Sequence, residues 1–414
     1  MKTVVVIGAG SRGYEAYGNY ILKNPHKIKA IGVVEPDPIK RERFARAHNL
    51  DKNYVFSSIE EFFAKDRMAD AVIISTPDMF HVEPAIKAIE KGYHILLEKP
   101  IAPDLDGVCK IYDAYKKGNS LIIVAHVLRY TSFFRKIKEL LDKNYIGETI
   151  GINLVENVGF FHYAHSFVRG NWRNTDFSAP FILAKSCHDL DILYWLSSSK
   201  AKYITSFGEL THFKKEKAPK EAKERCIWGC MVENCPYDAR RIYLRDYTGW
   251  PVSVITMDLS LEGRIKALEE TNYGKCVYYS DNNVMDHQIA NIVFENGKMA
   301  TLTVTAFTND ITRKINIYGT HGEIYGNLIN GEIRINIFGR YEEVVKVDVR
   351  DDHAGGDEGI MDSFVKMLET YELPTTTLED SIESHAMAFS AEKSRINNGI
   401  PIAVEEFRKK ILEG

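Results

Sequence analysis

The sequence predicts a doubly wound α/β domain with a parallel sheet, followed by an α+β domain with a large, open, mostly antiparallel sheet. Up to about residue 127, short and continuously apolar runs alternate with stretches whose apolar residues recur at helical spacing. After about residue 150, longer runs and Asn-Gly turns replace that alternation. A chain of 414 residues is long enough for two or three domains. We therefore assign residues 1–127 to the first domain and residues 128–414 to the second.

The first domain is predicted from strands that are apolar along their whole length, as in a parallel sheet with helices on both faces. We expect these strands at residues 3–8, 29–35, 71–76, 94–98 and 121–125. The amphipathic stretches between them predict helices at residues 38–47, 82–91 and 107–117. Sheets of this kind bind ligands at the carboxyl ends of their strands, so the turns that follow the strands are the first places to search for a site.

The second domain is predicted from a long strand at residues 149–159 and a hairpin at residues 287–307. Asn296-Gly297 fits a tight hairpin turn whose two central residues both have positive φ, and Asn330-Gly331 separates two further runs, 323–329 and 332–338. Helices are expected at residues 181–196, 358–370 and 378–397. An insertion around residues 212–245 contains the charged stretch KKEKAPKEAKER, which indicates a solvated loop.

Composition excludes several classes of protein. Apolar residues make up 45% and charged residues 27% of the chain, which is typical of a folded globular protein. The 53 Lys and Arg against 57 Asp and Glu give a net charge of −4, which argues against sequence-independent nucleic-acid binding. No apolar run approaches the roughly 18 residues of a membrane span. The start MKTVVVIG continues into a strand without a cleavage site, so we expect a cytoplasmic protein with reduced thiols.

A glycine fingerprint follows the first strand and begins a helix. Gly8-Ala9-Gly10-Ser11-Arg12-Gly13 has the spacing in which the first Gly permits a tight turn, the second lets the backbone approach a pyrophosphate, and the third allows close helix packing. Glu35 ends the second strand, where an acidic side chain accepts hydrogen bonds from ribose hydroxyls and repels a 2′-phosphate. The pattern predicts NAD binding in preference to NADP. A glycine-rich turn without a nucleotide is the alternative.

A lysine follows the expected fourth long strand, in Glu98-Lys99-Pro100. A Lys at the carboxyl end of such a strand faces the ligand cleft, where it can bind a substrate hydroxyl and stabilise a developing alkoxide. The proline fixes the turn and favours an extended backbone at Lys99. A surface lysine after a strand is the alternative.

Together these motifs resemble the glucose–fructose oxidoreductase/inositol dehydrogenase family (Gfo/Idh/MocA). The likeness covers nearly the whole chain and rests on residues 7–13, Ser75-Thr76-Pro77-Asp78 with His81, Glu98-Lys99-Pro100, residues 186–191 and residues 318–322. It implies an N-terminal Rossmann domain followed by an α+β domain whose open sheet forms the subunit interface of a homodimer or homotetramer. It also implies oxidation or reduction of sugar and cyclitol hydroxyls with NAD(P).

The resemblance implies catalytic roles for two residues. Lys99 matches the lysine that contacts both substrate hydroxyl and cofactor, and His188 matches the acid/base on the helix that lines the cleft. Where relatives commonly have an Asp four residues before that histidine, this chain has Ala184. Lys185 is the residue we expect to enter the site instead, and Asp191, three residues after His188, orients the imidazole or makes a surface or inter-domain contact.

The same resemblance and the local chemistry give the expected contacts. The cofactor residues are Gly8, Gly10, Ser11, Arg12, Gly13, Glu35, Ser75, Thr76, Pro77, His81, Glu98, Lys99, Trp172 and Arg173. The substrate residues are Arg129, His165, Arg169 and His188. His162 shares the aromatic and polar stretch FHYAHSFVRGNWR with His165 and Arg169, and a structural loop rich in aromatic residues is the alternative there.

Three cysteines lie close together in the insertion. Cys226, Cys230 and Cys235 would bind zinc or iron–sulfur if a fourth ligand were supplied, and His212 is the nearest candidate. Neither a paired Cys-x-x-Cys set nor a paired His set is present, so we expect a lid-like loop with reduced thiols and no metal.

The sequence therefore predicts an NAD-dependent dehydrogenase of carbohydrate metabolism that acts on a secondary hydroxyl of a sugar, glycoside or cyclitol. A redox-neutral glycoside hydrolase, in which NAD is regenerated in place, is one alternative. A sensor of sugar or NAD without catalysis is another. Neither nucleic acids nor membranes are expected partners.

Overall fold

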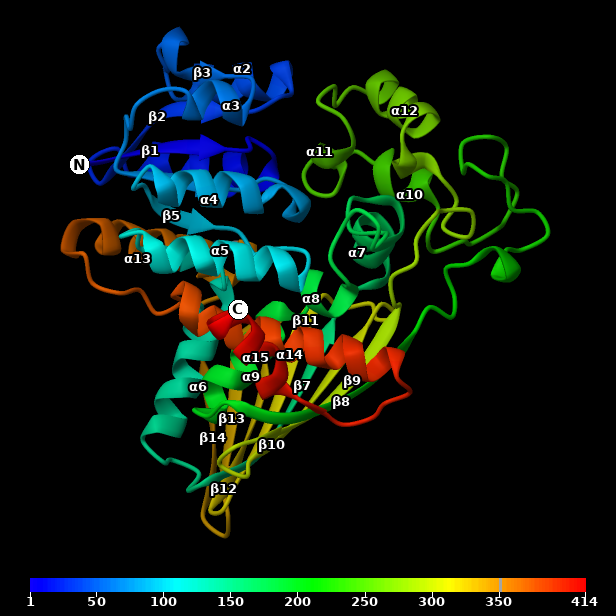
Figure 1. The fold of residues 1–414 in the computed structure, drawn as a ribbon. Coiled ribbons are helices and arrows are strands. Elements are labelled where there is room, and N and C mark those ends of the chain that lie inside the picture. The colour runs from blue at the N-terminus through cyan, green and yellow to red at the C-terminus, as the bar shows by residue number, and fades with distance from the viewer. Residues whose placement is uncertain (350–351) are drawn as a thin grey trace.

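The computed structural model describes residues 1–349 and 352–414, and Figure 1 shows their arrangement. The N-terminal sheet has six parallel strands in the order β3-β2-β1-β4-β5-β6. These strands are β1 (Lys2–Ile7), β2 (Ile28–Val34), β3 (Val55–Phe56), β4 (Ala71–Ile74), β5 (His94–Leu97) and β6 (Ile122–Val124). This order, with β1 between β2 and β4, is that of a doubly wound sheet, which confirms the predicted class of the first domain.

Helices cover both faces of this sheet, so its strands are buried on both sides. Val5 and Ile7 belong to one core cluster, whereas Val4 and Val6 belong to another on the opposite face. The helical elements of this part are the π-helix η1 (Ser11–Gly18), α1 (Asn19–Lys23), α2 (Pro38–Ala47), η2 (Lys52–Tyr54), α3 (Ile59–Phe63), η3 (Asp78–Phe80), α4 (Val82–Glu90) and α5 (Leu105–Lys117). The predicted helices are therefore present with nearly the expected bounds.

The second sheet has nine strands in the order β14-β13-β12-β11-β7-β10-β9-β8-β15. They are β7 (Thr149–Asn157), β8 (Ala201–Glu209), β9 (His287–Phe294), β10 (Met299–Thr305), β11 (Thr312–Gly319), β12 (Gly322–Asn327), β13 (Glu332–Ile337), β14 (Tyr341–Lys346) and β15 (Ile402–Ala403). Only β7 and β10 pair in parallel within it. The large, mostly antiparallel sheet of the prediction is confirmed.

The hairpin between β9 and β10 differs from the expected turn. Phe294 N–H bonds to Lys298 O at 2.9 Å, and of the two predicted turn residues only Gly297 has positive φ, at 85°. A three-residue connection that ends on a left-handed glycine is the next commonest hairpin loop. Asn296 instead uses its side chain, accepting from Lys298 N–H and donating to Ser197 O.

Further helices pack on one face of the nine-stranded sheet or on the first sheet and so connect the two sheets (Figure 1). They are η4 (Val127–Tyr130), α6 (Ser132–Asp142), α8 (Phe181–Ala184), α9 (Cys187–Ser197), η8 (Leu328–Asn330), η9 (Asp352–Gly355), α13 (Gly356–Thr370), α14 (Leu378–Ile396) and α15 (Val404–Glu413). Although we assigned residues 356–370 to the second domain, α13 packs on the first sheet, where Ile360 and Phe364 join the core of Val4 and Val6. None of the described helices combines the length and apolarity needed to cross a bilayer.

The segment between β8 and β9, residues 210–286, forms a separate lobe beside α7 (Phe160–Tyr163) in Figure 1, and we call it the insertion lobe. It contains η6 (Lys215–Lys217), α10 (Ala239–Tyr243), α11 (Val252–Ile255), α12 (Leu261–Glu270) and η7 (Asn272–Gly274). It has its own small core, in which Ile242, Tyr243 and Leu268 are buried. The insertion is thus longer than expected and largely folded, although its charged part is mostly exposed.

Candidate active site

The glycine turn after β1 is shaped for close backbone approach. Gly8 has a φ of +91°, and a Cβ on it would lie 2.8 Å from Thr76 N. A Cβ on Gly13 would lie 1.9 Å from Gly8 O, so both positions require glycine for packing within the protein. Gly10 is different, because a Cβ there would meet no atom within 4 Å. Its open side is the space that a pyrophosphate needs at the start of η1.

Glu35 lies beside this turn at the end of β2. Its carboxylate accepts the Ala9 N–H at 2.7 Å and the Asp37 N–H at 3.0 Å, and the side chain is largely buried. The charge is therefore fixed next to the glycine turn, at the position where doubly wound domains bind the adenosine ribose. The residues present fit a dinucleotide.

Arg12 does not reach toward the open side of Gly10. Its guanidinium contacts Glu98 Oε1 at 2.5 Å and the carboxylate of Asp357 at 2.7 and 2.8 Å, and Tyr17 O–H donates to the same Glu98 oxygen. Burial alone would raise the pKa of Glu98, but the Arg12 charge and the Tyr17 hydroxyl outweigh it and lower that pKa. This ionised cluster ties the glycine turn to the β5 turn and to α13.

The turns after β4 and β5 are joined by His81. One ring nitrogen lies 2.9 Å from Thr76 O and the other 2.8 Å from Pro100 O, so the buried imidazole bridges the two turns. Ser75 O–H donates to Gly8 O at 2.8 Å. Asp78, which the sequence motif includes but to which we assigned no role, accepts the Ala179 N–H at 3.0 Å and so contacts the second domain.

Lys99 connects the β5 turn to the helices of the second domain. Its Nζ donates to Ala184 O at 2.8 Å. Ala184 ends α8, and His188 lies in the first turn of α9, so the predicted single helix at residues 181–196 is interrupted at the site. Carbonyls at a helix C-terminus lack intrahelical partners, which leaves Ala184 O available to the ammonium. The fold therefore brings Lys99 to the segment that holds His188.

Two further histidines that we did not predict lie in a row with His188. The His126 ring centroid is 5.9 Å from that of His188 and 6.0 Å from that of His385. His385 accepts the Ile101 N–H through Nε2 and bonds to Ser381 O through Nδ1, so it is the neutral Nδ1–H tautomer. Burial lowers the pKa of His385 to about 3 and also holds the pKa of His126 well below its ordinary value. His126 follows β6 at its carboxyl end, and that position is the signal from which it could have been found.

Lys185 lies in a buried ionic network beneath α9. Its Nζ is 3.0 Å from Glu156 Oε1 on β7, while Arg313 Nε on β11 lies 2.9 Å from Glu156 Oε2 and 2.8 Å from Asp189 Oδ1. Burial lowers the pKa of Lys185 against the attraction of Glu156. Burial also raises the pKa of Asp189 to about 6, although Arg313 opposes this. Glu156 and Asp189 are the carboxylates of this network, and Asp189 directly follows His188 in the sequence.

Arg129 and Asp191 pair with each other. Arg129 Nε and Nη2 bond to the Asp191 carboxylate at 2.7 and 2.6 Å, and Nη1 bonds to Asp380 at 2.5 Å. The guanidinium is only 3% exposed. We expected Arg129 to bind substrate, but two carboxylates already hold it. Asp191 also lies 4.0 Å from His126 Nδ1, next to the row of histidines that includes His188.

His165 and Arg169, expected to bind substrate, are buried in the π-helix η5 (Ala164–Arg169) and face the insertion lobe. His165 Nδ1 lies 2.9 Å from the Tyr243 hydroxyl, and its ring stacks on Tyr273 at 5.0 Å. Arg169 donates to the backbone carbonyls of Lys275 and Tyr237, both at 2.7 Å. These contacts hold the lobe against η5.

Trp172 and Arg173, expected at the cofactor, lie just after η5. Arg173 Nε bonds to Asp281 Oδ1 at 2.7 Å, so its guanidinium is engaged by the insertion lobe. Trp172 is 37% exposed and packs beside Phe167 with the two rings tilted by 37°. Trp172 is thus the more exposed of the two, whereas Arg173 is only partly buried.

The fold and the glycine turn define a two-domain, dinucleotide-binding protein. The family profile described as "Oxidoreductase family, NAD-binding Rossmann fold" matches residues 2–126, and the "GFO/IDH/MocA C-terminal domain" profile matches residues 134–325. The chain therefore belongs to the Gfo/Idh/MocA family, and its N-terminal domain is an NAD-binding Rossmann fold. This confirms the resemblance on which the sequence analysis relied.

Relatives of known class support the same assignment. YteT of Bacillus subtilis, described as an oxidoreductase, is 24% identical over 81% of this chain and 79% of that protein. Inositol 2-dehydrogenase of Corynebacterium glutamicum is 26% identical over 48% of this chain and 54% of that protein, so the match spans about half of each. An oxidoreductase from Agrobacterium radiobacter, solved in complex with NAD+, L-tartaric acid and magnesium, shares the fold with a TM-score of 0.71. It is 15% identical and is matched over 98% of this chain and 99% of that chain.

Proposed function

We propose that this protein is an NAD-dependent dehydrogenase that moves a hydride between the nicotinamide and a secondary hydroxyl of a sugar, glycoside or cyclitol. The observation that carries the proposal is the contact between Lys99 Nζ and Ala184 O, which brings the Lys99 ammonium to the helix end that precedes His188. A cyclitol substrate for a relative, inositol 2-dehydrogenase, supports this class of substrate.

The two residues have complementary tasks. Lys99 has three N–H donors and uses one on Ala184 O, so two remain for a substrate oxygen. The positive charge stabilises that oxygen as it becomes an alkoxide. His188 removes the hydroxyl proton, because an imidazole with an ordinary pKa of about 6.5 exchanges protons near neutrality. When bound, NAD supplies the hydride acceptor.

Lys185 positions this pair in our proposal and does not touch the substrate. Its ion pair with Glu156 anchors the break between α8 and α9, and that break presents both Ala184 O and His188. This chain has Ala184 where relatives commonly have an Asp, so in our proposal His188 carries out the proton transfer without that Asp. The carboxylates of the buried ionic network come instead from β7 and α9.

NAD is preferred over NADP in this proposal because the fixed carboxylate of Glu35 repels a 2′-phosphate. The cytoplasm is the proposed location, because six free cysteines are typical of a reducing compartment. Self-association through the outer face of the nine-stranded sheet is also proposed, since large apolar side chains are exposed there.

The experiment that tests the function is absorbance at the reduced-nicotinamide band with a panel of sugars, cyclitols and aryl glycosides. A dehydrogenase forms reduced cofactor in proportion to oxidised substrate, which is the expected result. Release of aglycone without net reduction would replace the proposal with redox-neutral hydrolysis. Binding of NAD with neither signal would replace it with a sensor.

A further inference from the structure

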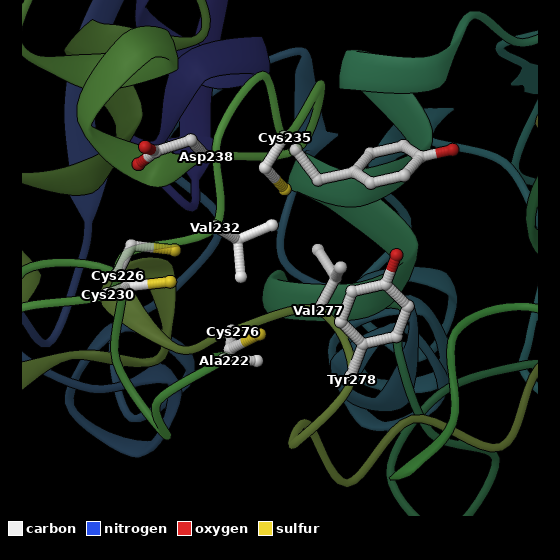
Figure 2. Close-up of a pocket in the computed structure, with 10 residues that line it drawn as sticks. Ala222, Cys226, Cys230, Val232, Cys235, Asp238, Cys276, Val277 and Tyr278 are labelled. Atoms are coloured by element: carbon white, nitrogen blue, oxygen red, sulfur yellow. The ribbon is translucent and has the colours of Figure 1, made fainter. Parts of the chain in front are cut away.

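Four cysteines line one small cavity inside the insertion lobe. Cys226, Cys230 and Cys235 form its wall together with Cys276, which lies far downstream in the sequence. Figure 2 shows the four side chains around one space, and in this view Val232 lies between Cys235 and the other three cysteines. His212, the nearest candidate in the sequence for a fourth ligand, has its Nε2 3.1 Å from the Tyr278 hydroxyl and is not part of this wall.

Backbone pairing brings the fourth cysteine to the other three. Cys226 N–H bonds to Gly274 O at 3.1 Å, and Cys276 N–H bonds to Glu224 O at 2.8 Å. Between them, residues 225 and 275 form an antiparallel bridge. This short ladder sets Cys226 and Cys276 on neighbouring strands of chain. Cys230 and Cys235 then return to the same cavity through the tight turns that follow Cys226.

A buried positive charge lies against these thiols. Arg169 is 1% exposed, and its Nη2 is 3.7 Å from Cys226 Sγ. Its other partners are the carbonyls of Lys275 and Tyr237, while Nη1 has no hydrogen-bond partner. Within residues 1–349 and 352–414, no carboxylate pairs with Arg169, and the nearby Asp238 is held by Arg240 at 2.8 Å. Burying a cation without a counter-charge costs free energy, so a negatively charged group bound at this site would be stabilised.

We propose that Cys226, Cys230, Cys235 and Cys276 bind one metal centre through four thiolates, either a zinc ion or an iron–sulfur cluster. Thiolate ligands favour these soft metal centres. Four thiolates give the metal complex a net negative charge, which is the counter-charge that the buried Arg169 guanidinium otherwise lacks. The spacing Cys-x3-Cys-x4-Cys with one distant cysteine fits both. A proline follows Cys235, as it follows the last ligand in many ferredoxin motifs.

Both occupants require some movement of the thiols. In the part of the chain that the structure describes, no three metal-binding side chains are already gathered tightly enough to hold one ion. The cavity itself has room for about one atom, near 10 Å³, so a single ion fits its size, whereas a cluster needs the turns at residues 226–235 to move outward. Cys230 and Cys235 are only partly buried, which permits this movement.

In this proposal the metal centre stabilises the fold of the insertion lobe. Cys226 belongs to the small core of the lobe with Ile242 and Tyr243, and Arg169 links that core to η5. Small cores of this size are usually stabilised by disulfides or metals. The proposal is independent of the proposed dehydrogenase activity, because the Rossmann domain and its glycine turn do not contribute to the cavity.

The test is metal analysis of the full chain purified without oxygen and then reconstituted, in separate samples, with zinc and with iron plus sulfide. We expect close to one zinc, or one iron–sulfur cluster with its acid-labile sulfide, per chain. Cys276→Ser and Cys226→Ser should lower the bound metal roughly tenfold or more, whereas Cys109→Ser on α5, outside the cavity, should leave it unchanged. NAD binding should persist in all three variants, which separates this result from any failure of the proposed activity.

A measurement on the wild-type chain covers the case in which the cysteine variants do not fold. X-ray absorption at the metal edge should show a first shell of sulfur alone. Less than about a tenth of a metal per chain after both reconstitutions, a first shell of nitrogen or oxygen, or full metal content in folded Cys276→Ser would each overturn the proposal.

Discussion

At the residue scale, the account depends on side chains whose partners are distant in the sequence. Lys99 and Glu35 could be predicted because each follows a recognisable strand and belongs to a local motif. His385 and the ionic network around Lys185 could not be predicted, because their contacts join segments that are distant in the sequence, on β7, α9, β11 and α14. For the same reason, the pairing of Arg129 with two carboxylates could not be predicted, because these partners lie 62 and 251 residues away in the sequence.

Glu35→Ala should narrow the preference for NAD over NADP by about tenfold, which corresponds to about 1.4 kcal/mol. The reason is that the carboxylate beside Ala9 no longer repels a 2′-phosphate. Dissociation constants for both cofactors, measured by calorimetry, check this. Glu42→Ala is the control, because Glu42 is an exposed carboxylate on α2. Equal affinity of the unmodified protein for both cofactors would contradict the role of Glu35.

His188→Ala should lower turnover by about 10²–10⁴-fold while leaving the affinity for NAD nearly unchanged. Proton removal depends on the imidazole, whereas cofactor binding depends on the glycine turn and Glu35. Lys99→Ala should also lower turnover, and it should weaken NAD binding, because Lys99 lies between the two domains. Steady-state kinetics with the substrate found in the panel, together with NAD titration, measure both quantities. Full activity in His188→Ala would show that another group moves the proton.

At the element scale, the break between α8 and α9 is the feature that creates the site. The apolar pattern predicts one helix over residues 181–196, but α8 ends at Ala184, Ser186 has non-helical backbone angles, and α9 begins at Cys187. The Lys185 side chain is drawn to Glu156 on β7 there. The spacing of apolar residues cannot reveal such a break, because that spacing stays helical on both sides of it.

Lys185→Met should lower the free energy of unfolding by about 3 kcal/mol, because Glu156 loses one of its two buried cations. Turnover of the folded variant should fall far less than that of His188→Ala, since Lys185 positions the helix break. Denaturant unfolding and turnover per folded molecule separate the two effects. A loss of turnover equal to that of His188→Ala, with unchanged stability, would instead make Lys185 a catalytic residue.

The ionic network also predicts a pH dependence through Asp189. Burial raises its pKa from 3.8 to about 6, so between these values the folded state keeps a proton that the unfolded state has lost. Stability from this group is therefore fully present below pH 4 and declines as the pH rises toward 6. The free energy of unfolding of the wild type minus that of Asp189→Asn should fall over this window. A difference that rises with pH would show that Arg313 holds Asp189 ionised throughout.

At the scale of the whole molecule, the two sheets are joined by C-terminal helices. α13 covers the first sheet, while α14 contributes Leu378 and Ile382 to the core of the first domain and Ala386 and Met387 to that of the second. The order of both domains could be predicted from the change in hydrophobic pattern. The return of residues 356–370 to the first sheet could not, because an amphipathic helix does not identify the sheet that it covers.

The outer face of the nine-stranded sheet should be a subunit interface. Its exposed apolar side chains are Ile150, Tyr203, Phe207, Ile289, Val293, Met299 and Tyr318. Ile289→Glu should lower the molar mass measured by light scattering, since a buried charge at an apolar interface is costly. Ile39→Glu, on exposed α2 of the first domain, should not. A monomeric wild type would contradict this assignment.

The central claim is that a hydride moves between the nicotinamide and a carbinol carbon held by Lys99 and His188. The most direct measurement uses perdeuterated sugars and cyclitols and determines the mass of the recovered nicotinamide cofactor. We expect the cofactor to gain one deuterium with at least one substrate class, and His188→Ala to slow that gain by about 10²–10⁴-fold. Cofactor that is bound normally yet recovered without deuterium from every compound in the panel would contradict the account.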